Sequence, residues 1–182
     1  MCVAEKIVLS LPLSRDCLFI LDPSKATGPD GIPARILKEC SEQIAPSLCS
    51  LFNHSLRAGR FPSEWKSADV TPVHKKDLLE PAENYRPISL LPIASKVMEH
   101  CVCNRLYSHV SQSITSLQHG FMRSCSCSLQ LLSVLHSIGE ALDKNKQTDI
   151  LYFDFAKAFD TVDHAILIEK LKWYSVTSFF FQ

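Results

Sequence analysis

The residues best placed to do chemistry are the carboxylates that follow the most strand-like run of the chain, Ile150–Phe155 (ILYFDF). Side chains alternate along a strand, so Asp154 shares one face with Ile150 and Tyr152, and both faces are otherwise apolar. A carboxylate in a buried strand is costly unless it is hydrogen-bonded, paired with a cation or bound to a metal. Spacing alone leaves two interpretations open: Asp154 accepts backbone hydrogen bonds in the turn before the next helix, or it binds a metal.

Cysteines are the second group that could do chemistry. The chain has 8, and two CxC pairs, Cys101/Cys103 and Cys125/Cys127, lie near His100 and His119. Zinc knuckles usually separate their cysteines by two to four residues, so this spacing is not typical of a zinc site. Several cysteines fall inside helical patterns, which favours reduced thiols that pack in a core over a disulfide framework.

The elements that must position these residues are mostly helices. Apolar residues recur at helical spacing and caps follow in the expected places, with Gly59 as a C-terminal stop and Asp163 as an N-cap. The predicted helices are Pro33–Cys40, Glu42–Ala58, Ala94–Val110, Ser126–Asp143 and Ala165–Tyr174, and the predicted strands are Ala68–Val73 and Ile150–Phe155. Lys25–Gly31 (KATGPDG) is a dense turn signal. The fold class is therefore α/β (α+β) and helix-rich.

Composition excludes some classes of protein. At 182 residues, 46% hydrophobic and 21% charged, the chain can bury a core and is not disordered in character. The chain has equal numbers of basic and acidic residues, 19 of each, so its net charge does not attract a polyanion. Any site that binds a polyanion must therefore depend on a local cluster of basic residues. The apolar run Ile7–Leu13 is short and broken by Pro12, and no run has membrane-spanning length. We expect a protein of the cytoplasm or nucleus that is neither secreted nor membrane-bound.

Motifs along most of the chain carry a family resemblance. The segment FDFAKAFDTVDH is similar to the first catalytic motif of reverse transcriptases from non-LTR (LINE-type) retrotransposons. Four further segments follow the order of that family: KATGPDGIPARIL, FPSEWKSADVTPVHKKD, NYRPISLLPIASKVMEHCVCNRL and QHGF. The resemblance implies the fingers and the beginning of the palm of a right-hand polymerase at residues 21–174. Residues 1–20 would be an N-terminal extension and residues 175–182 a tail outside the family.

The resemblance assigns roles around the acidic motif. Asp154 matches the catalytic aspartate that binds magnesium in the palm, and Phe155 would offer a backbone carbonyl to the metal. Phe159 matches the aromatic residue that lies against the incoming sugar and rejects a 2′ hydroxyl; taken alone it is equally an apolar anchor of the turn. Asp160 and Asp163 are expected to cap and close that turn.

Other roles concern the incoming nucleotide. Arg86 matches the fingers arginine that grips the triphosphate, a task suited to a guanidinium fork. Lys75 and Lys76 would lie at the tip of a fingers hairpin, where the family has a lysine that contacts phosphate. The QHGF element places Gln118, Gly120 and Phe121 near template and nucleotide; without the family, it is an ordinary turn before a helix.

The sequence also departs from the family. Family members carry an aromatic-Ala-Asp-Asp hairpin with the remaining metal-binding carboxylates, and this sequence contains no Asp-Asp pair. We therefore expect a fragment, truncated after the first catalytic palm motif, that is inactive alone although the family acts on an RNA template, a DNA primer and dNTPs. The strand at Ile150–Phe155 would be an exposed edge that promotes self-association. Two alternatives remain: a non-catalytic RNA-binding or interaction fragment, and a decayed element without function.

Overall fold

The chain is described by a computed structural model that covers residues 8–75 and 78–176. It divides into two compact units, one formed by the chain up to His109 together with the segment from Ile168 onward, and one formed by Val110–Leu167. The helices are α1 Leu11–Phe19, α2 Ala34–Glu39, α3 Ser41–Ala58, α4 Ile93–Val110, α5 Cys127–Asp143 and α6 His164–Trp173. The strands are β1 Asp69–His74 and β2 Tyr85–Leu90. The helix-rich, mixed α/β class is confirmed.

Helix α3 shows why the periodic segments fold as predicted. Its apolar residues face the core, and Gly59 ends it in the left-handed region with φ of 62°. The amide of Gly59 donates to the carbonyl of Leu56 at 3.3 Å and that of Arg60 to Ser55 at 3.2 Å, so the last carbonyls of the helix are satisfied. The hydroxyl of Ser55 also donates to the carbonyl oxygen of Arg60 at 2.6 Å.

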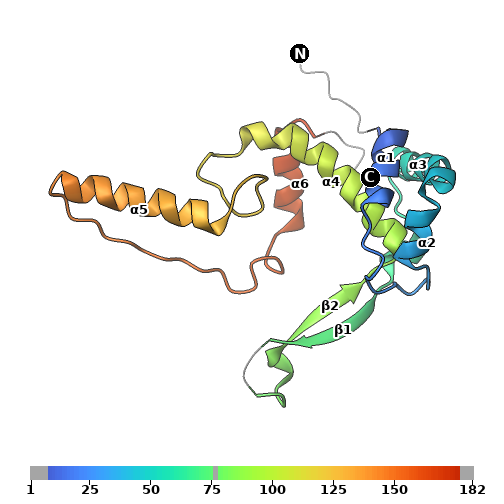
Figure 1. Cartoon of the computed structure of the whole chain (residues 1–182), viewed down its shortest axis with the longest axis horizontal. Helices are drawn as coiled ribbons and strands as arrows, with labels where there is room; N and C mark the ends of the chain where they lie inside the picture. Colours follow the sequence, from blue (N-terminus) through green and yellow to red (C-terminus); the bar gives the residue numbers. More distant parts are fainter. Residues whose placement is uncertain (1–7, 76–77, 177–182) are drawn as a thin grey trace. The chain divides into compact units, whose positions relative to one another are not determined.

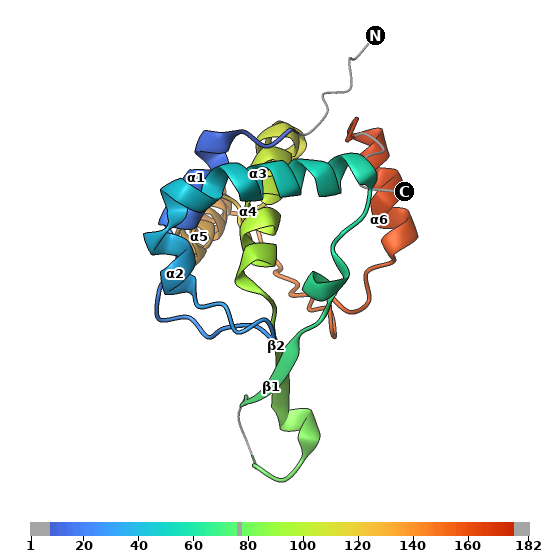
Figure 2. The same cartoon turned by 90° about the vertical axis from the view of Figure 1, so that its right-hand side faces the viewer.

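The first unit has a core built from α1, α3 and α4. Figure 2 shows α3 lying across α4, with α1 beside α3. The fully buried side chains include Leu18, Phe52, Val97 and Cys101. Trp65 packs edge-on against Phe52, with ring centroids 5.8 Å apart. Burial of this apolar surface is the main force that stabilises the unit.

Helix α1 lies in a segment where no helix was predicted. Its side chains Cys17 and Leu18 are buried. The segment before it is fixed by Asn53, whose Oδ1 accepts from the amide of Leu9 at 2.9 Å and whose Nδ2 donates to the Leu9 carbonyl at 2.8 Å. The residues before Leu21 therefore contribute to the core of the first unit.

The turn-rich segment between α1 and α2 packs closely on the start of α4. A Cβ atom at Gly28 would lie 2.5 Å from the carbonyl carbon of Leu91 and from the nitrogen of Pro92. Gly31 has a different constraint, a φ of 65°, and no atom near the position of a Cβ. The KATGPDG turn is thus held against another part of the fold.

Strands β1 and β2 form an antiparallel hairpin that projects from the helices of the first unit (Figure 1). The register pairs Val73 with Arg86 and His74 with Tyr85. The amide of Lys75 donates to the carbonyl of Asn84 at 2.7 Å, which continues the ladder beyond β1. The prolines at 72 and 87 face each other, and the ribbon has no third strand among the described residues.

The second unit differs from the prediction at Ile150–Phe155. This segment has no strand structure, and its side chains are exposed, with Tyr152 and Phe153 each 86% exposed. The predicted buried strand is therefore wrong in this structure. A strand needs a neighbour for its backbone hydrogen bonds, and β1 and β2, the strands of the described residues, pair only with each other.

Helix α5 in the same unit has the predicted position, starting after an N-cap in which Ser126 Oγ accepts from the amide of Leu129 at 3.2 Å. Its apolar face is exposed, and no residue of Val110–Leu167 is buried. In the described part of the chain, no helix is long and apolar enough to span a bilayer.

Candidate nucleotide-binding site

The hairpin brings two of the predicted phosphate-binding residues to one face. Arg86 lies opposite Val73, and Lys75 is two residues beyond Val73 on the neighbouring strand. Because side chains alternate along a strand, Lys75 and Arg86 share a face as diagonal neighbours. Both side chains are exposed. Lys76, the other predicted lysine, lies outside the described residues.

The opposite face of the hairpin carries no Lys, Arg, Asp or Glu from β1 or β2. His74 and Tyr85 pack edge-on there, with ring centroids 5.3 Å apart. Pro72 and Pro87 follow on the same face. The two cations are thus separated from the aromatic pair by the ribbon itself, and a polyanion would be attracted to the face that carries Lys75 and Arg86.

The QHGF element forms a tight, exposed turn in the second unit. Gln118 Nε2 donates to the carbonyl of Gly120 at 2.9 Å, and the amide of Met122 donates to the carbonyl of His119 at 3.3 Å. Phe121 follows in the left-handed region, with φ of 61°. Its ring is 90% exposed.

The acidic motif forms a second exposed turn in this unit. Lys157 has φ of 51°, and its carbonyl accepts from the amides of Asp160 at 2.9 Å and Thr161 at 3.1 Å. Phe159 projects from this turn, and its ring lies edge-on to that of Phe121, with centroids 5.9 Å apart and planes at 86°. The structure therefore brings together two motifs that are far apart in the sequence.

Asp154 is exposed, as is Phe155. Asp154 is therefore not in a buried strand, and because its carboxylate is solvated, no metal or cation is required to offset burial. Asp163 behaves as predicted: its Oδ1 accepts from the amides of Ala165 at 2.8 Å and Ile166 at 3.2 Å, which caps α6.

The described cysteines are free thiols. Cys17 of α1 and Cys101 of α4 are both buried. Burial raises the pKa of both, that of Cys101 from 9.0 to about 12. Within residues 8–75 and 78–176, no three side chains of His, Cys, Asp or Glu are grouped so as to hold a metal. The CxC pairs therefore form no such group there.

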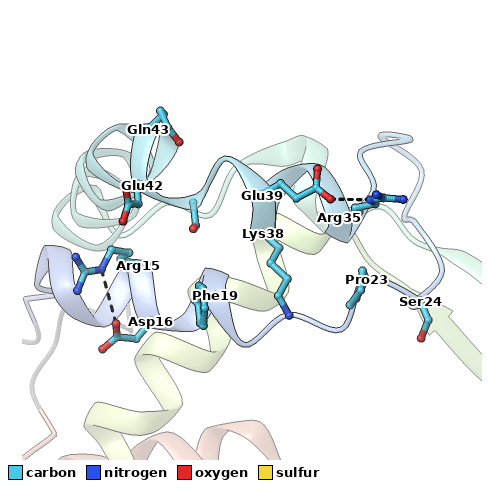
Figure 3. A pocket seen from close by; sticks show the side chains of 11 residues that line it. Arg15, Asp16, Phe19, Pro23, Ser24, Arg35, Lys38, Glu39, Glu42 and Gln43 are labelled. Atoms are coloured by element: carbon cyan, nitrogen blue, oxygen red, sulfur yellow. Dashed lines mark hydrogen bonds and ion pairs between the residues drawn. The ribbon is translucent and has the colours of Figure 1, made fainter.

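A cleft of about 1100 Å³ in the first unit was not anticipated from the sequence. It is lined by residues of α1, α2 and the start of α3 (Figure 3). Lys38 is held within it, because Nζ donates to the carbonyl of Leu21 at 2.8 Å and lies 5.9 Å from the ring centroid of Phe19. Arg35 pairs with Glu39 at 2.7 Å. Acidic and basic side chains balance along the cleft, so it offers no strong field to an anion.

Comparison with known proteins identifies the family. Residues 73–180 match the family described as reverse transcriptase (RNA-dependent DNA polymerase), which is more than half of the chain. The chain belongs to the reverse transcriptase family. The hairpin strand β2, the QHGF turn and the acidic motif all lie within the matched residues of this reverse transcriptase segment.

Three relatives come from mobile elements, and two of them are named as RNA-directed DNA polymerases. The chain is 33% identical over 174 residues to the RNA-directed DNA polymerase from mobile element jockey of Drosophila melanogaster, covering 90% of this chain and 19% of the relative. It is 36% identical over 153 residues to the probable RNA-directed DNA polymerase from transposon X-element of the same organism, covering 82% and 17%. Identity to the transposon TX1 uncharacterized 149 kDa protein of Xenopus laevis is 27% over 177 residues, covering 92% and 13%. The reverse transcriptase chain spans less than a fifth of the length of these curated relatives.

Proposed function

We propose that this chain forms the fingers and the beginning of the palm of a non-LTR retrotransposon RNA-directed DNA polymerase, and that it binds the incoming nucleotide. The polymerase part would begin at residue 21 and continue past residue 174, because the family match runs to residue 180, and residues 1–20 would be an extension that packs on it through α1. The substrates of the complete enzyme would be an RNA template, a DNA primer and dNTPs. Its place of action would be the nucleus or the cytoplasm.

The observation that carries this proposal is the register of the β1–β2 hairpin. It places Lys75 and Arg86 on one exposed face of a projecting ribbon, as diagonal neighbours. Two cations on one face are suited to a triphosphate, because arginine binds phosphate oxygens with a planar fork and lysine adds a point charge. Lys76, the next residue in the sequence, is proposed to share this role.

The QHGF and acidic motifs are proposed to have roles toward the template and the nucleotide sugar, as the family resemblance implies. Gln118, Gly120 and Phe121 would lie near template and nucleotide, and Phe159 would meet the sugar and reject a 2′ hydroxyl. The exposed position of both rings is compatible with this role, since a gate must be open to its ligand.

The described residues do not fit a two-magnesium centre by themselves. Asp154 and the carbonyl of Phe155 offer a carboxylate and one further oxygen, and no group of three ligand side chains surrounds them in the described part of the chain. Two metals need carboxylates that bridge both ions. We therefore propose that Asp154 is a metal ligand only in a complete palm and that this polypeptide alone does not extend primers.

Two assays test the proposal. Isothermal titration of the chain with dATP should show binding that Lys75→Ala and Arg86→Ala each weaken. The matched control is Arg57→Ala, which removes an exposed cation from α3 of the same unit. Equal affinity of wild type and both hairpin variants would contradict the proposal. Primer extension by the purified chain, abolished by Asp154→Ala, would contradict the proposed inactivity.

A binding role without chemistry is the second candidate. The exposed apolar side chains of Ile150–Phe155 favour association with a second copy through this segment, because large exposed apolar patches mark interaction sites. Sedimentation should then show oligomers that Leu151→Glu reduces. A monodisperse wild-type monomer would argue against self-association, and absence of salt-dependent RNA binding would favour a remnant without function.

A further inference from the structure

Phe121 has a backbone conformation that bulky residues rarely adopt. Its φ of 61° lies in the left-handed region, where a side chain with a Cβ is strained. The conformation is held locally, since Gln118 Nε2 donates to the carbonyl of Gly120 and the amide of Met122 closes the turn on His119. Burial does not offset the strain, because the ring is 90% exposed. Such strain at an exposed residue points to a functional constraint.

The contact of Phe121 indicates what that constraint is. Its ring meets the ring of Phe159 edge-on, at 5.9 Å between centroids and 86° between planes, which is a favourable aromatic geometry. The backbone of the Phe159 turn is fixed by hydrogen bonds to the carbonyl of Lys157. The ring itself is 77% exposed, so packing in a core does not select its rotamer.

We propose that Phe121 is a positioning residue that holds the ring of Phe159 in the orientation needed to discriminate deoxyribonucleotides from ribonucleotides. This inference rests on the proposed role of Phe159 against the sugar. The strained backbone of Phe121 aims its ring at Phe159, and the edge contact favours one orientation of Phe159 by roughly two- to tenfold. Sugar selectivity thus depends on a residue of the QHGF turn that does not itself touch the sugar.

The test uses the intact chain and two probes, dATP and ATP, each with Mg²⁺, in titrations followed by NMR. Wild type should bind dATP more tightly than ATP, by about tenfold, as expected when one hydroxyl is rejected. Phe121→Leu and Phe121→Gly should lower this ratio by roughly two- to tenfold, because both remove the aromatic edge. Glycine adopts the left-handed conformation freely, so that variant keeps the turn. Phe121→Tyr retains the edge and should retain the ratio.

Failure of the inference and failure of the proposed function give different results. If Phe159→Ala removes the discrimination while Phe121→Leu and Phe121→Gly keep it, the positioning role is wrong and the gate stands. If wild type binds both nucleotides equally, or Phe159→Ala leaves the ratio unchanged, the gate itself is wrong and the inference falls with it. A ratio lost in Phe121→Tyr as well would show that the phenylalanine acts by something other than its aromatic edge.

Discussion

Replacement of Gly28 by alanine is expected to destabilise the first unit severely. The added Cβ would lie 2.5 Å from the carbonyl carbon of Leu91 and from the nitrogen of Pro92, and 2.6 Å from the carbonyl oxygen of Leu91. Carbon atoms pack at about 3.5–4.0 Å, so the two segments must separate by roughly 1 Å. Every clashing atom belongs to the backbone, and no side chain can rotate away.

The magnitude follows from the cost of overpacking, which is typically about 1–3 kcal/mol, and a backbone clash at the start of α4 should reach the upper end. A loss of about 3 kcal/mol lowers the melting temperature of a domain of this size by roughly 10–20 °C. Thermal unfolding followed by tryptophan fluorescence reports the change, because Trp65 packs against Phe52 in the core. The second tryptophan, Trp173, is 79% exposed and contributes a background.

Two matched glycine variants separate the clash from other effects. Gly31→Ala places a Cβ in open space but at φ of 65°, so it should cost only about 1–2 kcal/mol of strain. Gly139→Ala lies within α5, meets nothing within 4 Å and should raise the helix content without moving the Trp65 transition. The reasoning would be refuted if Gly28→Ala destabilised the unit no more than Gly31→Ala does.

Three further predictions concern packing, thiols and capping. Phe52→Ala should lower the free energy of unfolding in urea by about 3–5 kcal/mol, whereas Leu51→Ala, 42% exposed on the same helix, should cost far less; equal losses would contradict the assigned core. Cys101 should react with iodoacetamide much more slowly than exposed Cys103, and equal reactivity of the two thiols would contradict the burial. Because the pKa of Cys101 is raised in the folded state, its contribution to the free energy of unfolding should be fully present below pH 9 and fall as the pH rises toward 12. Cys101→Ala should lose less stability over that pH interval. Asp163→Ala should lower the stability of α6 by about 0.5–2 kcal/mol, as measured by amide hydrogen exchange, because the N-cap acceptor is lost. Asp163→Asn keeps an acceptor and should cost little, so equal losses in the two variants would contradict the cap assignment.

The helices could be predicted from sequence where a long periodic pattern ended in a recognisable cap. Helices α3 and α5 have such patterns, with Gly59 and Ser126 at their ends. Helix α1 was missed because it is short and contains Pro12, and its place depends on packing against α3 and on the bonds of Leu9 to Asn53. Distant contacts of this kind leave no local pattern.

The arrangement of the candidate site residues could not be predicted from the sequence. The motif Ile150–Phe155 has strong strand character, yet a strand forms only with a partner that satisfies its backbone groups. Likewise the shared face of Lys75 and Arg86 follows from the hairpin register, which one strand cannot reveal. The contact of Phe121 with Phe159 depends on positive φ angles at Phe121 and Lys157. Glycine is the residue that usually adopts such angles, so these two residues do not signal the turn conformation.

The most direct test of the central claim is an NMR titration of the isotope-labelled chain with dATP that observes both faces of the hairpin. We expect the side-chain signals of Lys75 and Arg86 to shift in a saturable manner, while those of His74 and Tyr85 on the opposite face shift little. Equal shifts on both faces, or shifts confined to regions outside the hairpin, would contradict the claim that this ribbon binds the nucleotide triphosphate.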